Sequence, residues 1–139
     1  MAGFDRRTGQ MIGNLEHAYQ GVEVIMTTRI AERLMLREFG GGVAELLGRA
    51  VTPSLFLVWR QLIATAIDLW EPRFRVRSVT VSSSAGEARL GTIALSIFAD
   101  YRPYAHLPKT DSRYSLKVDR TVTFGVGIAS GNVTVGTMV

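Results

Sequence analysis

The sequence of 139 residues contains no cysteine and only two histidines, His17 and His106. Without cysteine the chain forms no disulfide and offers no thiolate to a metal ion. The two histidines lie far apart in sequence, and no cluster of other ligand-type residues accompanies either one. We therefore expect no metal site, no cofactor and no histidine catalysis, and we interpret both histidines as surface or core residues.

Long apolar runs are absent as well. No stretch reaches the roughly 18 apolar residues of a membrane span, and no apolar run follows the charged N-terminus as it does in a secretory signal. Hydrophobic residues make up 47% of the sequence and charged residues 20%, which is typical of a globular domain. We therefore expect a soluble protein that is made in the cytoplasm and has no membrane partner.

Lysine is nearly absent. Lys109 and Lys117 are the only lysines among the 16 cations, so the other fourteen are arginines. Arginine favours the planar, bidentate contacts of protein interfaces, although an arginine-rich genome gives the same bias. The net charge is +4 without a dense basic patch, so we expect no nucleic-acid partner.

The first half of the sequence has the apolar spacing of helices. Residues 1–13 are rich in glycine and predict an irregular arm. Apolar residues at helical spacing predict a helix over about 14–26, with Asn14 as its N-cap. Residues 29–39 fit either a short helix or a turn and strand, and 43–50 fit a short helix. Thr52-Pro53 then predicts the start of an 18-residue core helix that Pro72 closes.

The period of the pattern changes to two after Pro72. Arg73, Arg75 and Arg77 alternate with less polar residues, so they are expected on one face of a strand. This face is either a solvated outer surface or a contact for an acidic protein partner. Val79 and Val81 break the alternation, which indicates a bulge or twist. A turn at 82–86 and a second strand at 88–101 complete an antiparallel hairpin.

The C-terminal segment is a further alternating stretch. It has no charge from Gly125 to Val139, and neither lysine nor proline after Lys117. An unpaired strand edge of this kind promotes aggregation unless a partner covers it. We predict that residues 113–139 leave the compact domain and pair with a neighbouring subunit; the alternative is a hairpin that completes the chain's own sheet. The apolar face of this stretch consists of Val122, Phe124, Val126 and Ile128.

These patterns predict an α+β fold: N-terminal helices packed on a small antiparallel sheet, with an extended C-terminal hairpin or strand tail. We place a first domain at 1–104 and a C-terminal β-rich extension at 105–139. Asp68 and Glu71 could form the carboxylate pair of a glycoside hydrolase. Arg73 favours the ionised form of Glu71, whereas a general acid must carry a proton, so we favour an ion-paired helix end.

Residues 27–40 and the tripeptide Glu71-Pro72-Arg73 resemble the phage baseplate protein W family, and the resemblance extends over about 9–101. The family often has proline and glycine where Arg29 and Ala31 stand here. The resemblance implies a non-enzymatic wedge subunit of a contractile tail that offers strands to the first sheath ring, with Glu71 and Arg73 anchoring it in the wedge. It also implies six copies of the chain in the virion baseplate. The implied partners are the sheath protein, the wedge proteins and the tail tube or hub proteins. The alternative is a peptidoglycan hydrolase of the baseplate.

Overall fold

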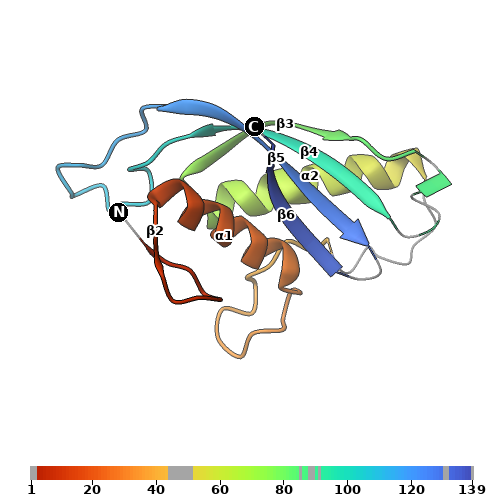
Figure 1. Ribbon diagram of the computed structural model, residues 1–139, viewed down its shortest axis with the longest axis horizontal. Helices are drawn as coiled ribbons and strands as arrows, with labels where there is room; N and C mark the ends of the chain where they lie inside the picture. The colour runs from red at the N-terminus through yellow and green to blue at the C-terminus, as the bar shows by residue number, and fades with distance from the viewer. Residues whose placement is uncertain are drawn as a thin grey trace.

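The computed structural model describes residues 3–43, 52–84, 86–87, 90, 92–129 and 132–138. Figure 1 shows helices packed on a twisted antiparallel sheet, which confirms the predicted α+β class. The predicted helix at 43–50 lies, apart from Val43, outside the described residues. The elements are β1 (Gly3–Phe4), β2 (Met11–Ile12), α1 (Asn14–Thr27), α2 (Pro53–Trp70), β3 (Phe74–Val81), β4 (Ile93–Tyr101), β5 (Arg120–Ala129) and β6 (Asn132–Met138).

The N-terminal arm is more regular than predicted. β1 and β2 form a small antiparallel hairpin, in which Phe4 lies opposite Met11. Gly9 adopts a φ of 72° in the turn, a conformation that glycine tolerates best. The arm ends at Gly13, whose N–H donates to the carboxylate of Glu16 at 3.1 Å. This bond caps the start of α1, so Asn14 is the first residue of the helix and not its N-cap.

Helix α1 ends where two threonines compete with the helical hydrogen bonds. The hydroxyl of Thr27 donates to the carbonyl of Glu23 at 2.8 Å, and the hydroxyl of Thr28 donates to that of Val24 at 2.7 Å. Threonine hydroxyls commonly bond to the preceding turn in this way and favour helix ends. The helix buries one face towards the core, formed by Ala18, Val22, Ile25 and Met26.

Helix α2 begins and ends as its sequence predicts. The hydroxyl of Thr52 accepts a hydrogen bond from the N–H of Leu55, and Pro53 occupies the first turn, where no N–H is needed. The last turn closes when the N–H of Glu71 donates to the carbonyl of Ile67 at 2.8 Å. Of the described helices, none is long and apolar enough to span a membrane. The buried stripe of α2 is Leu55, Trp59, Ile63, Ala66 and Ile67.

The main sheet has the strand order β3-β4-β5-β6, and all neighbours are antiparallel. The register between β3 and β4 shifts between Val76 and Ser78, so the bulge lies at Arg77, ahead of the predicted position. Helix α2 contacts β3 and α1 contacts β6, and the helices also contact each other. The core lies between the helices and the sheet, with an aromatic cluster of Tyr19, Phe74, Tyr101 and Phe124.

The C-terminal strands belong to this sheet, so the prediction that residues 113–139 leave the compact domain is wrong for β5 and β6. β5 pairs with β4 over nine residues and occupies an inner position of the sheet. Phe124, Val126 and Ile128 are at most 1% exposed, and Val122 packs at the margin of the same core. The apolar alternation therefore marks an internal strand, and these side chains face the chain's own core instead of a partner.

Candidate assembly surfaces

The tripeptide Glu71-Pro72-Arg73 forms a buried corner between α2 and β3. Arg73 donates from Nε to Glu71 Oε1 at 2.7 Å and from Nη2 to Oε2 at 2.8 Å, a bidentate ion pair. Glu71 is 5% exposed and Arg73 is 6% exposed. Proline between them restricts the backbone, and the N–H of Phe74 donates to the carbonyl of Glu71 at 3.0 Å. The two charges therefore fix the direction in which the strand leaves the helix.

The same corner ties three distant segments together. Arg73 Nη1 donates to Asn14 Oδ1 at 2.9 Å and lies 3.1 Å from His17 Nδ1, so it holds the first turn of α1. Arg102 donates from Nη2 to the carbonyl of Pro72 at 3.1 Å. Asn14 and His17 are three residues apart on one helix, and this spacing was the available sequence signal for their shared role. Arg73 therefore faces the interior, and the prediction of one arginine face for residues 73, 75 and 77 is wrong at this position.

The other two arginines of this stretch lie on the surface. The side chains of Arg75 and Arg77 are 60% and 65% exposed. Arg75 pairs with Asp68 at 3.3 Å, and Arg77 forms an ion pair with the buried Asp100 across the bulge. The hydrogen bond from Arg77, opposed by desolvation, lowers the pKa of Asp100. These ion pairs leave both guanidinium groups partly available to a partner.

A groove lies between α2 and β3 next to these arginines. It has a volume of about 320 Å³ and is open to solvent. Its apolar part includes Leu57, which is 63% exposed, and Arg60 and Arg77 supply its two charges. No acidic residue lines it, so the groove suits a partner that carries carboxylates. Its full lining is Leu57, Arg60, Gln61, Ala64, Val76, Arg77, Ser78 and Val79.

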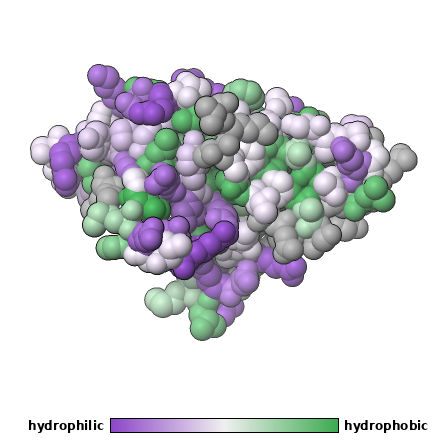
Figure 2. All heavy atoms as spheres, viewed as in Figure 1, coloured by the Kyte–Doolittle hydropathy of each residue, from purple (hydrophilic) through white to green (hydrophobic). Residues whose placement is uncertain are grey.

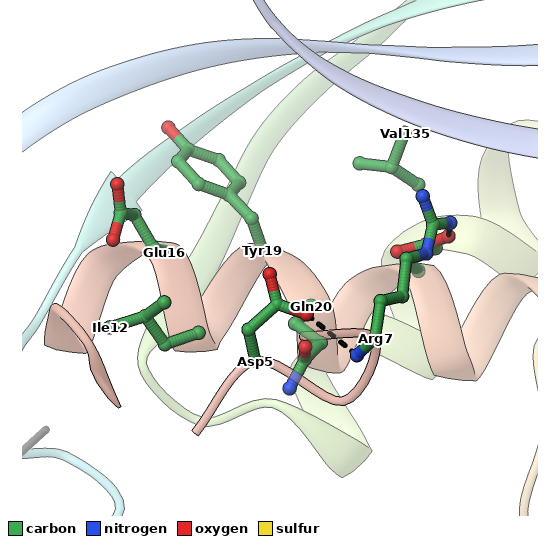
Figure 3. A pocket seen from close by; sticks show the side chains of 8 residues that line it. Asp5, Arg7, Ile12, Glu16, Tyr19, Gln20 and Val135 are labelled. Carbon is green, nitrogen blue, oxygen red and sulfur yellow. Dashed lines mark hydrogen bonds and ion pairs between the residues drawn. The ribbon is translucent and has the colours of Figure 1, made fainter. Parts of the chain in front are cut away.

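A second pocket lies between the N-terminal arm, α1 and β6 (Figure 3). Its acidic side chains are already bound locally. Arg6 and Arg7 both bond to Glu23, at 3.2 and 2.6 Å. Backbone N–H groups of Arg7 and Thr8 donate to Asp5 and lower its pKa. These carboxylates fasten the arm to α1.

The two edges of the sheet differ in chemistry. β3, at one edge, carries Arg75, Arg77 and the bulge, features that discourage further pairing. β6, at the other edge, has the sequence NVTVGTM, which contains no charge and no proline. Within the described part of the chain β6 pairs with β5 alone, over seven residues. Thr134 and Gly136 are exposed on this strand. β6 is therefore the edge that can accept another strand.

The residues of the predicted carboxylate pair are both engaged in structure. Glu71 is buried against Arg73. Asp68 pairs with Arg75 and also accepts the N–H of Val76 at 3.2 Å. Among the described residues no group of three or more His, Asp or Glu side chains is placed to hold a metal ion. The arrangement is that of a corner stabilised by ion pairs.

The comparison with known proteins places this chain among the baseplate components of contractile tails. It belongs to the family described as baseplate wedge protein gp25, which matches residues 14–103. Baseplate protein W of Escherichia phage P2 is 33% identical over 82 residues, which cover 59% of this chain and 71% of the phage protein. The resemblance inferred from the residues around Glu71-Pro72-Arg73 is thus confirmed.

Solved structures of other proteins share this fold. A chain of the post-contraction baseplate of pyocin R2 is 27% identical, with a TM-score of 0.63 over 73% of this chain and 99% of that chain. A Geobacter sulfurreducens protein named as a candidate tail lysozyme shares the fold at 21% identity, with a TM-score of 0.58 over 91% of this chain and 93% of that chain. A chain of the anti-feeding prophage baseplate shares it at 18% identity and a TM-score of 0.51, over 98% of this chain and 79% of that chain.

Proposed function

We propose that this wedge subunit starts sheath assembly by pairing the open edge of β6 with a strand of a subunit in the first sheath ring. The observation that carries the proposal is the difference between the two sheet edges. β6 offers main-chain groups without charge, proline or bulge, whereas β3 has arginines and a bulge. Strand addition takes its affinity from main-chain hydrogen bonds, so an unobstructed edge is what it requires.

The position of β6 makes it a firm support for such a strand. β6 is paired along its length to β5, and β5 is paired over nine residues to β4 in the core. Val135 of β6 also lines the pocket between the N-terminal arm and α1. An added strand would therefore extend a sheet that is already folded, and little ordering of this chain would oppose binding.

The opposite side of the molecule suits the remaining baseplate partners. We propose that Arg75, Arg77 and the groove between α2 and β3 contact an acidic surface of a wedge, tube or hub protein in a ring of six copies. The groove has apolar lining and two cations but no acid, which supports a partner of opposite charge. The corner at Glu71, Pro72 and Arg73 contributes by fixing the direction of β3, because its charged groups are buried.

The sheath proposal is tested by placing lysines on the β6 edge. Thr134 and Gly136 are exposed, and a Cβ added at Gly136 meets nothing within 4 Å, so Thr134→Lys/Gly136→Lys should fold normally. Lysine at an edge discourages strand pairing. In a strain that produces the particle, this variant should enter baseplates, and electron micrographs should show tubes without sheath.

The matched control is Ser78→Lys/Thr80→Lys on the β3 edge, where both residues are also exposed. This variant should produce sheathed tails at the wild-type level. Normal sheath on the Thr134→Lys/Gly136→Lys particles would remove the basis of the proposal. Loss of sheath in the β3 variant alone would show that the sheath strand pairs with the β3 edge instead.

We also propose that the chain has no peptidoglycan hydrolase activity. The support is that Glu71 is buried in a bidentate pair with Arg73 and that Asp68 is bound to Arg75. Neither carboxylate is arranged to protonate a leaving group while the other attacks or activates water. The test is turbidity clearing of purified peptidoglycan by the isolated protein. Clearing that is abolished in a folded Glu71→Gln variant would establish the hydrolase instead.

A further inference from the structure

The segment from Thr28 to Gly40, here called the 28–40 loop, projects from the body of the molecule after α1 (Figure 1). Its backbone is closed on itself: the N–H of Ala31 donates to the carbonyl of Arg37 at 2.7 Å. Ala31 and Leu36 have φ values of 68° and 56°, in the left-handed region that residues with a side chain rarely adopt. A loop that holds two such residues is conformationally defined, and strain of this kind is concentrated at functional sites.

The base of the loop is anchored to the core. The ring of Phe39 lies 5.1 Å from that of Trp70 at the end of α2, and the Arg33 guanidinium lies 3.9 Å from the centre of the Phe39 ring. Gly40 has a φ of 145°, and a Cβ there would lie 2.7 Å from the carbonyl oxygen of Thr28. Only glycine fits this crossing of the two ends. The loop is thus held in one orientation relative to α2.

The tip of the loop presents large aliphatic side chains to solvent. Leu34 is 90% exposed, Met35 is 83% exposed and Leu36 is 57% exposed. Figure 2 shows hydrophobic side chains at the end of the projection that the loop forms in Figure 1. Scattered exposed apolar residues are common, but three consecutive ones on a constrained projection are typical of a binding site. Nothing within the described chain covers them.

We propose that the tip of the 28–40 loop inserts into an apolar pocket with a net acidic rim on a neighbouring baseplate protein. Residues 29–39 contain three arginines and two glutamates on either side of the apolar tip, here called the collar, with a net charge of +1. No described residue forms an ion pair with the side chains of Arg29, Arg33 or Arg37. A pocket with a small excess of carboxylates complements this collar.

The collar and the tip favour a protein pocket over a lipid surface. Membrane-bound segments combine a broad apolar face with many cations, whereas the tip of this loop has three large aliphatic side chains and the loop carries two carboxylates, Glu32 and Glu38. A compact apolar anchor with a polar surround is the usual centre of a protein interface. Met35 adds a flexible, polarisable side chain that adapts to the shape of a pocket. The loop is also already ordered, so binding costs little entropy.

The inference rests on membership of the baseplate, and it does not depend on the role of β6 in starting the sheath. The test variant is Leu34→Ser/Met35→Ser, which changes only exposed side chains and should keep the wild-type melting temperature. The amount of this chain in purified baseplates should fall at least tenfold, measured by quantitative mass spectrometry. The matched control Leu90→Ser alters a side chain that is 85% exposed elsewhere, and it should be incorporated normally.

A second measurement identifies what the tip contacts. A photo-crosslinking amino acid at position 35 should join this chain to a different baseplate protein in assembled particles, and Arg29→Glu/Arg37→Glu should weaken incorporation. Incorporation of Leu34→Ser/Met35→Ser within twofold of wild type would refute the inference. Crosslinking only to another copy of this chain would refute it too, as would wild-type binding to phosphatidylglycerol vesicles that the serine variant lacks. The β6 lysine variant, by contrast, should be incorporated and lack only sheath, so the two proposals fail separately.

Discussion

The buried pair of Glu71 and Arg73 allows a quantitative prediction. Both residues are at most 6% exposed and share two hydrogen bonds, so Glu71→Gln leaves an arginine charge in the interior without its counter-ion. Removing one member of a buried pair typically costs about 3–5 kcal/mol. Total stabilities of domains are about 5–15 kcal/mol. Glu71→Gln should therefore lower the melting temperature by roughly 10–20 °C in a chain of this size.

Urea unfolding followed by tryptophan fluorescence measures the free energies, since Trp59 is buried in the core, and heating the same samples measures the melting temperature. Arg73→Gln should cost a similar free energy of unfolding, because it leaves the buried carboxylate of Glu71 unpaired and also removes the contacts with Asn14 and His17. The double variant Glu71→Gln/Arg73→Gln has no uncompensated charge. It should therefore be more stable than the sum of the single effects predicts, by about 1–3 kcal/mol.

An exposed ion pair provides the control. Asp119 bonds to Arg120 on the surface, and Asp119→Asn should leave the urea midpoint unchanged. Single substitutions at Glu71 and Arg73 that each cost less than about 1 kcal/mol, or effects that simply add, would show that solvent screens the pair. The corner would then be held by Pro72 and the backbone bonds alone.

Three further predictions follow from the core and its margins. Gly21→Ala places a Cβ 2.3 Å from Glu71 Oε2 and should cost about 1–3 kcal/mol in urea unfolding, whereas Gly136→Ala meets nothing within 4 Å and should be neutral. Burial, reinforced by the charge of Arg73, lowers the pKa of His106 below its ordinary 6.5. The unfolded chain therefore binds this proton first, and the free energy of unfolding should fall as the pH drops below about 6.5; a slope in His106→Gln equal to that of wild type would contradict this. Truncation after Asp111 removes β5 from the core and should abolish cooperative thermal unfolding, which circular dichroism would detect.

The helices could be predicted from sequence because their signals are local. Thr52-Pro53 marks the start of α2 through a side-chain cap and a missing N–H, both of which act within one turn. The hairpin of β3 and β4 was predictable because its strands are adjacent in sequence, although β4 begins at Ile93 and not at the predicted residue 88. The 28–40 loop was not predicted, because its shape depends on Gly40 meeting Thr28 and on Phe39 meeting Trp70.

The direction of Arg73 and the place of β5 depend on partners distant in sequence. Period-two spacing puts Arg73 on the face of Arg75, but the residue precedes β3 and turns inward, where it bonds to Asn14 and contacts His17 of α1 as well as its neighbour Glu71. The uncharged C-terminal stretch fits equally well in an inner strand of its own sheet and in a strand donated to a neighbour. Nine residues of register with β4 decide in favour of the first, and no local pattern contains that information.

The antiparallel order of β4, β5 and β6 has a mechanical consequence. A load that pulled on β6 along its own axis would strain all seven residue pairs with β5 at once, whereas a load that peeled β6 from one end would break them in turn. The pairing between β5 and β4 has nine residue pairs, and the buried side chain of Phe124 adds apolar packing to it. Under axial pull the pairing between β5 and β6 should therefore break first, and the core should stay folded. A load applied at this edge would therefore free β6 while β3, β4 and β5 stay paired.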